Sequence, residues 1–245
     1  MPAALAAMPD NTTTDMVLLG DVEVTLTSAA GAVNVLRGVS LSIEPGATVS
    51  LIGPSGSGKT TLLMTIAGLV RPSAGLVRVA GVDLAGLDED GLARFRRDAI
   101  GIVFQAFHLV STMTALENVA LPLEFAARGD AFAGAAAALD AVGLGSRVNH
   151  YPSELSGGEQ QRVALARAFA AEPRIILADE PTGNLDGATG NHVMDLLFHL
   201  AAERSTTLLL ITHEAELARR ADRIIELHDG RVLRDSGRPL PAVAG

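Results

Sequence analysis

The sequence predicts an α/β fold, and two patterns carry that prediction. Three short apolar runs, at residues 47–53, 174–180 and 206–214, are continuously hydrophobic, which is expected of parallel strands that are covered on both faces. A helical pattern follows each run, so strands and helices alternate along the chain as they do around a parallel sheet. We therefore expect a parallel core sheet with helices packed against it.

Other segments add two substructures to this core. The N-terminal part alternates more between apolar and polar residues and is punctuated by glycines, which predicts antiparallel strands at residues 16–28, 36–46 and 75–84. From about residue 105 to 171 the pattern is helical and predicts a helical subdomain inserted between core strands. Within it, the alanine-rich run 131–145 fits a plain structural helix.

The patterns predict one domain over residues 15–235, between a disordered N-terminal tail at 1–14 and a flexible C-terminal tail at 236–245. With 48% hydrophobic and 19% charged residues, a chain of 245 residues can bury a substantial core. Its first basic residue is Arg37, which argues against a secretory signal. Its apolar runs are shorter than the roughly 20 residues of a membrane span, so we expect a cytoplasmic protein.

The composition also excludes several classes of function. A net charge of −9 argues against a nucleic-acid partner. The chain contains no cysteine, which removes disulfides, thiolate metal sites and cysteine nucleophiles. His213 and Glu214 lack the second histidine four residues on that a zinc-protease helix needs.

The stretch GPSGSGKTT, residues 53–61, matches the pattern G-x-x-x-x-G-K-[ST] in full and predicts a P-loop NTPase core. Its glycines allow backbone N–H groups to wrap around phosphate oxygens, and the loop opens a helix whose positive dipole end points at the same phosphates. Lys59 is expected to reach the β- and γ-phosphates, and the Thr60 hydroxyl to bind Mg²⁺. The residues predicted to contact the nucleotide are Gly53, Pro54, Ser55, Gly56, Ser57, Gly58, Lys59, Thr60 and Thr61.

Two adjacent carboxylates end the second core strand. Asp179 and Glu180 lie where open α/β sheets place their ligands, at the carboxyl end of a buried strand. Asp179 suits the oxygen shell of Mg²⁺, and Glu180 could accept the proton of an attacking water. The alternative is that the pair only caps the next helix.

Two further polar residues also stand at predicted strand ends. His213 ends the third core strand, on the same sheet edge as Asp179, where it could hold the γ-phosphate and orient Glu180. Gln105 offers an amide at the junction between a strand and the helical insert, but its position alone says little about its role.

The stretch LSGGEQQR, residues 155–162, raises a separate question. Ser156 and Glu159 fit a capping box, in which each side chain accepts the backbone N–H of the other residue. The box leaves Gly157 and Gly158 unexplained, because almost any residue would serve there. Bare N–H groups at a helix start, beside a serine hydroxyl, form an anion site, so the chain carries a second phosphate-binding device.

Five motifs in this order resemble the ATP-binding cassette, or ABC, family of ATPases: GPSGSGKT, FQ, LSGGEQQR, LADEPTGNLD and ITHE. The resemblance covers residues 16–235 and implies the ABC ATPase fold, with ATP and Mg²⁺ as cofactors. It implies that two copies of the chain meet head to tail, so that the Ser156–Gly158 turn of one covers the γ-phosphate held by the other's P-loop. It also makes Glu159 part of the nucleotide site.

The same resemblance assigns roles to residues that the spacing alone leaves open. Gln105 is implied to sense Mg²⁺ and the transport subunit, His213 is the switch histidine, and Asn184–Asp186 form the loop across the dimer seam. Lys59, Glu180 and His213 are thus the expected catalytic residues, and Thr60, Gln105 and Asp179 the expected metal site. Hydrolysis would rest mainly on positioning and charge neutralisation.

Within the family the motifs and their surroundings look most like the subgroup that includes LolD, MacB, FtsE and YbbA. That subgroup implies a separate membrane permease with a large extracytoplasmic domain, and a place on the cytoplasmic face of the membrane. The apolar residues Phe107, Leu109, Leu116 and Leu121 could receive the permease or be ordinary core. An alternative function is a regulatory subunit that transmits conformational change to an extracytoplasmic enzyme or envelope complex without moving cargo.

One departure from the family pattern concerns the nucleotide base. ABC ATPases commonly stack adenine on an aromatic residue in the N-terminal strands, but this chain has no aromatic residue before Phe95. Leu26 or Thr27 is expected near the base instead, and an aromatic stack is worth on the order of 1 kcal/mol. We therefore expect weaker or less base-selective nucleotide binding.

Overall fold

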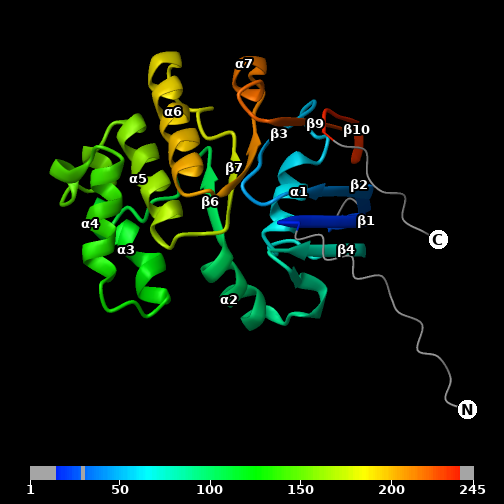
Figure 1. Ribbon diagram of the computed structural model, residues 1–245, viewed down its shortest axis with the longest axis horizontal. Helices are drawn as coiled ribbons and strands as arrows, with labels where there is room; N and C mark the ends of the chain where they lie inside the picture. Colours follow the sequence, from blue (N-terminus) through cyan, green and yellow to red (C-terminus); the bar gives the residue numbers. More distant parts are fainter. Residues whose placement is uncertain (1–14, 29–30, 238–245) are drawn as a thin grey trace, which may run out of the picture.

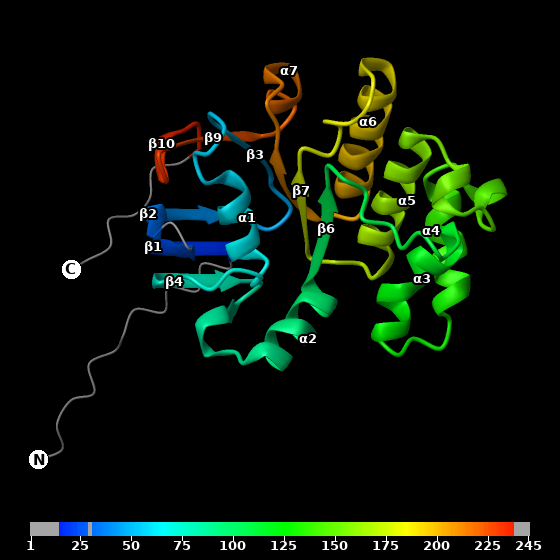
Figure 2. The ribbon, with the colours of Figure 1, turned by 180° about the vertical axis from the view of Figure 1, so that it is seen from behind.

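The computed structural model describes residues 15–28 and 31–237 (Figure 1). The predicted N-terminal tail, residues 1–14, lies outside the described residues, as do residues 238–245 of the predicted C-terminal tail. The described residues form two β-sheets and a group of helices. In both ribbon views the helices α3, α4, α5 and α6 lie on one side of the larger sheet, and α1 and the smaller sheet lie on the other (Figures 1 and 2).

The larger sheet is the predicted parallel core. Its strand order is β10-β9-β3-β8-β7-β6, and only the edge strand β10 runs antiparallel to its neighbour. The three predicted core runs are strands β3, β7 and β8. The strands are β3 (Thr48–Ile52), β6 (Ile100–Phe104), β7 (Ile175–Asp179), β8 (Thr207–Ile211), β9 (Arg223–His228) and β10 (Arg231–Asp235).

The smaller sheet confirms the predicted antiparallel subdomain, in the order β2-β1-β4-β5. Its strands are β1 (Val17–Ser28), β2 (Gly31–Ile43), β4 (Ala74–Val79) and β5 (Val82–Asp83). The segment expected at 75–84 forms two of these strands, β4 and β5, because the chain turns back at Ala80 and Gly81. Both residues have a positive φ, 53° and 83°, which is the backbone of a two-residue hairpin turn.

The helical insert is less continuous than expected. Helices α3 (Ala115–Phe125), α4 (Ala131–Ala141) and α5 (Gly157–Ala170) lie within it, but residues 105–114 are irregular. Helix α1 (Lys59–Ile66) follows the P-loop. Helix α2 (Glu89–Ala99) was not predicted from the sequence, whereas helices α6 (Gly187–Glu203) and α7 (Ala215–Ala218) follow β7 and β8 as predicted.

Strand β7 separates two hydrophobic cores. Ile176 and Ala178 belong to the core beneath α3–α6, whereas Ile175 and Leu177 belong to the core shared with α1 and the smaller sheet. All four side chains are fully buried, and each large one contributes about 1.5–3 kcal/mol by leaving water. Because both faces of the sheet are covered, the loops at the carboxyl ends of its strands are where polar groups gather. Within the described residues no helix is both long and apolar enough to cross a bilayer.

Candidate active site

The loop between β3 and α1 is shaped to surround an anion. Gly53 has a φ of 146°, and a Cβ there would lie 2.0 Å from the Leu227 carbonyl oxygen, so only glycine fits. At Gly56, with a φ of 79°, a Cβ would meet nothing within 4 Å, so the turn opens into free space. Helix α1 begins after Gly58 without any side-chain cap, which leaves its first N–H groups for a ligand.

Lys59 is held in place by this loop. Its side chain is 6% exposed, and Nζ donates to the carbonyl oxygens of Gly53 and Pro54, both at 2.9 Å. Burial lowers the pKa of Lys59, and the charges of Glu180 and Asp179 oppose that change. A buried ammonium with only neutral oxygens as direct partners is poised to bind a phosphate.

Asp179 and Thr60 meet between β7 and α1. Burial raises the pKa of the Asp179 carboxyl, and hydrogen bonding to the Thr60 side chain opposes that rise. The alternative that Asp179 and Glu180 cap the next helix is wrong, because Asp186 caps α6 by accepting from the Thr189 N–H at 3.0 Å.

These two side chains also fit a magnesium ion. Mg²⁺ in nucleotide sites uses one or two protein oxygens, with phosphate oxygens and water completing its shell. Burial disfavours the charged form of the Asp179 carboxylate, which lies beside the Thr60 hydroxyl and next to the phosphate loop. The two side chains therefore form a partial magnesium site of that kind. Across residues 15–28 and 31–237 no group of three or more His, Asp or Glu side chains could hold a metal by itself.

Glu180 and His213 approach each other at the ends of neighbouring strands. His213 Nε2 lies 2.5 Å from Glu180 Oε1, and the two side chains are 45% and 28% exposed. Glu180 has a φ of 48°, an uncommon backbone for a non-glycine residue. The structure therefore brings Lys59, Thr60, Asp179, Glu180 and His213 to one edge of the sheet.

The Ser156 turn forms the predicted capping box. The Glu159 carboxylate accepts from the Ser156 N–H at 2.9 Å and from its hydroxyl at 2.8 Å, and these bonds lower the pKa of Glu159. The expectation that almost any residue would serve at Gly158 is wrong. A Cβ there would lie 2.3 Å from Thr189 Cγ2, because α6 packs closely against α5. Packing alone thus requires Gly158, and Gly157 is less constrained.

Gln105 is hydrogen-bonded to Asn184, in the loop between β7 and α6. Its Nε2 donates to Asn184 Oδ1 at 3.3 Å, and the Asn184 amide donates back to the Gln105 carbonyl oxygen at 3.1 Å. Gly183 allows this contact, since a Cβ there would lie 2.6 Å from Gln105 Nε2. Phe104, the residue before Gln105, pairs with Asp179 in the sheet, so the backbone of Gln105 lies near Asp179. The side-chain amide of Gln105 is bonded to Asn184 instead.

The Ser156 turn and the P-loop belong to different parts of the molecule. Helix α5 and helix α1 lie on opposite sides of β6 and β7 in both views (Figures 1 and 2). One buried polar residue of α5, Gln161, was not predicted from the sequence. Its position on the helix face formed by Gly158, Leu165 and Ala168, all buried, was the available signal.

Comparison with known proteins agrees with this geometry. The family model described as "ABC transporter" matches residues 36–183. The YbbA ATP-binding protein of Escherichia coli (strain K12) is 49% identical over 203 residues, which cover 81% of this chain and 88% of YbbA. The lipoprotein-releasing system protein LolD 2 of Caulobacter vibrioides is 49% identical over 205 residues, 83% of this chain and 90% of LolD 2.

A longer relative and a solved structure extend the comparison. The macrolide export ATP-binding/permease protein MacB of Rhodospirillum rubrum is 48% identical over 228 residues, 92% of this chain, and the chain spans only 35% of MacB. The structure of the ATP-binding cassette MJ0796, a dimer in a post-hydrolysis state with ADP and phosphate, superposes with a TM-score of 0.84 at 44% identity. The match covers 92% of this chain and all of that one.

Proposed function

Because this chain belongs to the ABC transporter family and is the ATP-binding, ATP-hydrolysing subunit of such a transporter, we propose that it works as a head-to-tail dimer that drives a separate membrane permease. Each site would hold one Mg-ATP between the P-loop of one copy and the Ser156 turn of the other. The observation that supports this best is the gathering of Lys59, Asp179 and Glu180 beside an uncapped helix start.

The chain's own residues would each do one task in hydrolysis. The ammonium of Lys59 leaves its loop carbonyls to neutralise the β- and γ-phosphates, and the N–H groups of α1 hold the same oxygens. Thr60 and Asp179 would hold Mg²⁺, which supplies charge neutralisation at the phosphates when bound. Glu180 accepts the proton of the attacking water, and His213 orients that carboxylate through their close contact.

The second copy is needed because the Ser156 turn has no phosphate of its own. Helix α5 lies across β6 and β7 from the P-loop, so the N–H groups of Gly157 and the Ser156 hydroxyl would serve a nucleotide held by the partner (Figure 1). The dimeric MJ0796 cassette, which resembles this chain over 92% of its length, supports such an assembly.

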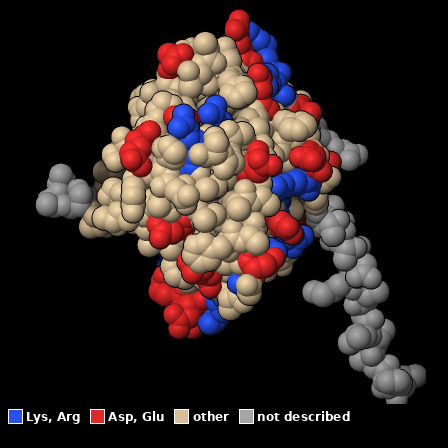
Figure 3. Space-filling view, turned by 90° about the vertical axis from the view of Figure 1, so that its left-hand side faces the viewer, with Lys and Arg blue, Asp and Glu red and all other residues tan. Residues whose placement is uncertain are grey.

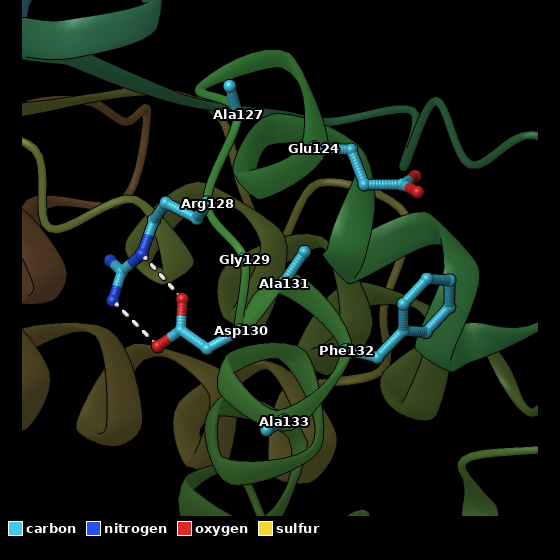
Figure 4. A pocket seen from close by; sticks show the side chains of 8 residues that line it. All are labelled: Glu124, Ala127, Arg128, Gly129, Asp130, Ala131, Phe132 and Ala133. Carbon is cyan, nitrogen blue, oxygen red and sulfur yellow. Dashed lines mark hydrogen bonds and ion pairs between the residues drawn. The ribbon is translucent and has the colours of Figure 1, made fainter.

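The corner between α3 and α4 is the surface that we assign to the permease. Phe125 and Phe132 are 71% and 49% exposed there, beside a hollow lined by residues 124 and 127–133 (Figure 4). Figure 3 shows a broad uncharged area on the same side of the molecule. MacB supports a permease as the occupant, because its name describes an ATP-binding and permease protein in one chain, and this chain spans 35% of it.

Two of the four apolar residues considered earlier for this contact belong to the core. Leu109 and Leu116 are partly buried and pack against the core beneath α3–α6, so they are part of the fold. A permease bound at the corner between α3 and α4 would place the chain on the cytoplasmic face of the membrane. The partner's large extracytoplasmic domain would then lie across the bilayer from it.

Phosphate release from the purified chain tests the dimer directly. We expect turnover with Mg-ATP whose rate per protein molecule rises with protein concentration, because only the dimer has complete sites. Lys59→Ala should remove both ATP binding and turnover. Constant specific activity across the concentration range, at concentrations where light scattering reports monomer, would contradict the dimer.

The permease assignment has its own test. Co-expressed with a candidate permease, the chain should be retained with it in detergent, and Phe125→Glu should release it while leaving turnover of the free chain intact. In vesicles, ATP turnover that extracts a membrane-embedded substrate supports transport. Turnover that only switches on a bound extracytoplasmic enzyme supports the regulatory alternative.

A further inference from the structure

A single buried amide joins helix α5 to the two loops that carry Gln105 and Glu180. The side chain of Gln161 is fully buried, and its Nε2 donates to the carbonyl oxygens of Pro181 at 2.6 Å and Phe104 at 3.3 Å. Pro181 directly follows Glu180, and Phe104 directly precedes Gln105. Because a carbonyl oxygen can only accept, these two neighbours fix which end of the amide faces them.

Packing alone does not account for this side chain. The other end of the amide, Oε1, is buried with no hydrogen-bond partner among the described residues. An unpaired buried acceptor lowers stability, and an apolar side chain of the same length, such as methionine, would avoid that cost. What the amide provides in return is the pair of bonds from Nε2.

One of those bonds supports a strained part of the chain. Glu180 has a φ of 48°, and such a conformation in a non-glycine residue persists only where its surroundings hold it. Its N–H donates to the Ile211 carbonyl at 3.0 Å, and its own carbonyl accepts from the Gly183 N–H at 3.0 Å. Gln161 adds a third restraint on the next residue, and it is the one that comes from α5.

Helix α5 also contacts the loop that carries Gln105 at a second point. Arg167 donates to the carbonyl oxygens of Phe107 at 2.9 Å and His108 at 2.7 Å, so residues 104–108 are bonded to α5 at both ends. Figure 2 shows α5 beside β6, and a Cβ at Gly101 of that strand would lie 2.4 Å from the Ala168 carbonyl oxygen. Helix α5 is therefore bonded to this loop and packed closely against the strand that precedes it.

We propose that Gln161 is a positioning residue for hydrolysis that couples the two ATP sites of the dimer. The proposal rests on the proposed function, in which the N-terminus of α5 covers a nucleotide held by the partner. Ser156 lies five residues before Gln161 in sequence, about 7.5 Å along a rigid helix. A shift of α5 caused by the partner's nucleotide is passed through the amide to Glu180, which acts on the nucleotide of its own chain.

The first arm of the test measures the restraint itself, without nucleotide or dimer. In hydrogen–deuterium exchange, Gln161→Met should speed exchange of the Glu180 and Gly183 amides. Asn118→Leu is the matched control, because Asn118 is also fully buried and donates to three backbone carbonyls, those of Val110, Met113 and Thr114. It should leave the Glu180 amide unchanged. Equal exchange in Gln161→Met and the wild type would overturn the proposal.

The second arm measures turnover against ATP concentration. We expect Gln161→Met to lower kcat by about tenfold or more with KM changed by less than about twofold, because Glu180 is misplaced while the P-loop is intact. The Hill coefficient should fall toward 1. Asn118→Leu should keep the wild-type kcat per folded molecule, although it is destabilised. A wild-type Hill coefficient of 1 would contradict the coupling between sites.

Gln161→Glu separates the hydrogen bond from packing. Its carboxyl group has almost the same shape as the amide but donates to the Pro181 carbonyl only when protonated. The activity of Gln161→Glu relative to the wild type should therefore rise as the pH falls, whereas that of Gln161→Met should stay flat. If wild-type turnover does not depend on dimer formation, the proposed function fails and this inference with it. If the wild type is cooperative and Gln161→Met matches Asn118→Leu, only this inference is overturned.

Discussion

His213 contacts Glu180 across the ends of two adjacent parallel strands, with Nε2 2.5 Å from Oε1. The contact matters because Glu180 directly follows Asp179 on β7, while His213 follows β8 by two residues. The imidazole thus holds the carboxylate that we propose as the general base, on the edge of the sheet that also carries Lys59 and Thr60.

The first prediction concerns that base. Glu180→Gln keeps the shape of the side chain but cannot take a proton, so kcat should fall by about 10²–10⁴-fold. Mg-ATP should still bind, and the variant should accumulate as an ATP-bound dimer in size-exclusion chromatography with light scattering. Turnover close to that of the wild type would show that another group accepts the proton.

The second prediction separates the Ser156 turn from simple helix capping. Ser156→Phe should leave ATP binding by the monomer intact but suppress dimer formation and turnover, because the bulky ring would enter the seam. Thr114→Phe is the matched control, since Thr114 and Glu117 form an equivalent capping box on α3. A lost N-cap costs about 1 kcal/mol in either variant.

Light scattering and nucleotide titration read out this pair of variants. Thr114→Phe should dimerise with ATP like the wild type. If Ser156→Phe loses monomer ATP binding instead, the turn serves its own chain and the seam assignment is wrong.

The third prediction follows from the raised pKa of Asp179. Because burial raises the pKa of Asp179 above its ordinary value of 3.8, the folded chain holds this proton more tightly than the unfolded chain does, and the free energy of unfolding falls as the pH rises from 3.8 through the raised pKa. Asp179→Asn should therefore raise Tm without nucleotide and abolish the additional rise that Mg-ATP gives the wild type.

Thermal unfolding with and without Mg-ATP measures both effects. Asp195→Asn is the control, because its carboxylate is 66% exposed and lies in a surface ion pair with Arg220, so Tm should change little. A lower Tm for nucleotide-free Asp179→Asn at neutral pH would count against the buried-carboxylate explanation.

The fourth prediction concerns the base of the nucleotide. Leu26, which with Thr27 is the residue expected near the base, is 45% exposed on β1. Without a stacking partner, ATP and GTP should bind with comparable affinity. Leu26→Tyr should tighten ATP binding by about fivefold, corresponding to roughly 1 kcal/mol of stacking. Strict ATP preference in the wild type, or no gain in the variant, would place the base elsewhere.

The sheet and most of the site were predictable because their signals are local. Continuous apolar runs gave β3, β7 and β8, and polar residues at or just beyond the ends of β7 and β8 gave Asp179, Glu180 and His213. The P-loop was recognisable because its glycines stand at fixed spacing, at positions where the backbone has a positive φ. The capping box of α5 was equally local, since its two partners lie three residues apart.

The parts that were missed depend on contacts between distant segments. The need for glycine at position 158 comes from Thr189 on α6, which no pattern around α5 contains. Gln161 acts through the carbonyls of Phe104 and Pro181, at separations of 57 and 20 residues. The bond between Gln105 and Asn184 spans 79 residues. The turn at Ala80 was hidden because an alternating pattern continues through it.

The central claim is that each site is shared between two copies, and complementation in mixed dimers tests it most directly. Lys59→Ala alone and Ser156→Phe alone should each be inactive. Mixed together, their heterodimer has one complete site, formed by the intact P-loop of one copy and the intact Ser156 turn of the other, so turnover should rise well above the sum of the two separate preparations. The control mixes the double variant Lys59→Ala/Ser156→Phe with an equal amount of wild type, whose heterodimer has no complete site and adds no turnover beyond the wild-type homodimer. No gain on mixing the single variants, although light scattering shows heterodimers, would contradict the shared site.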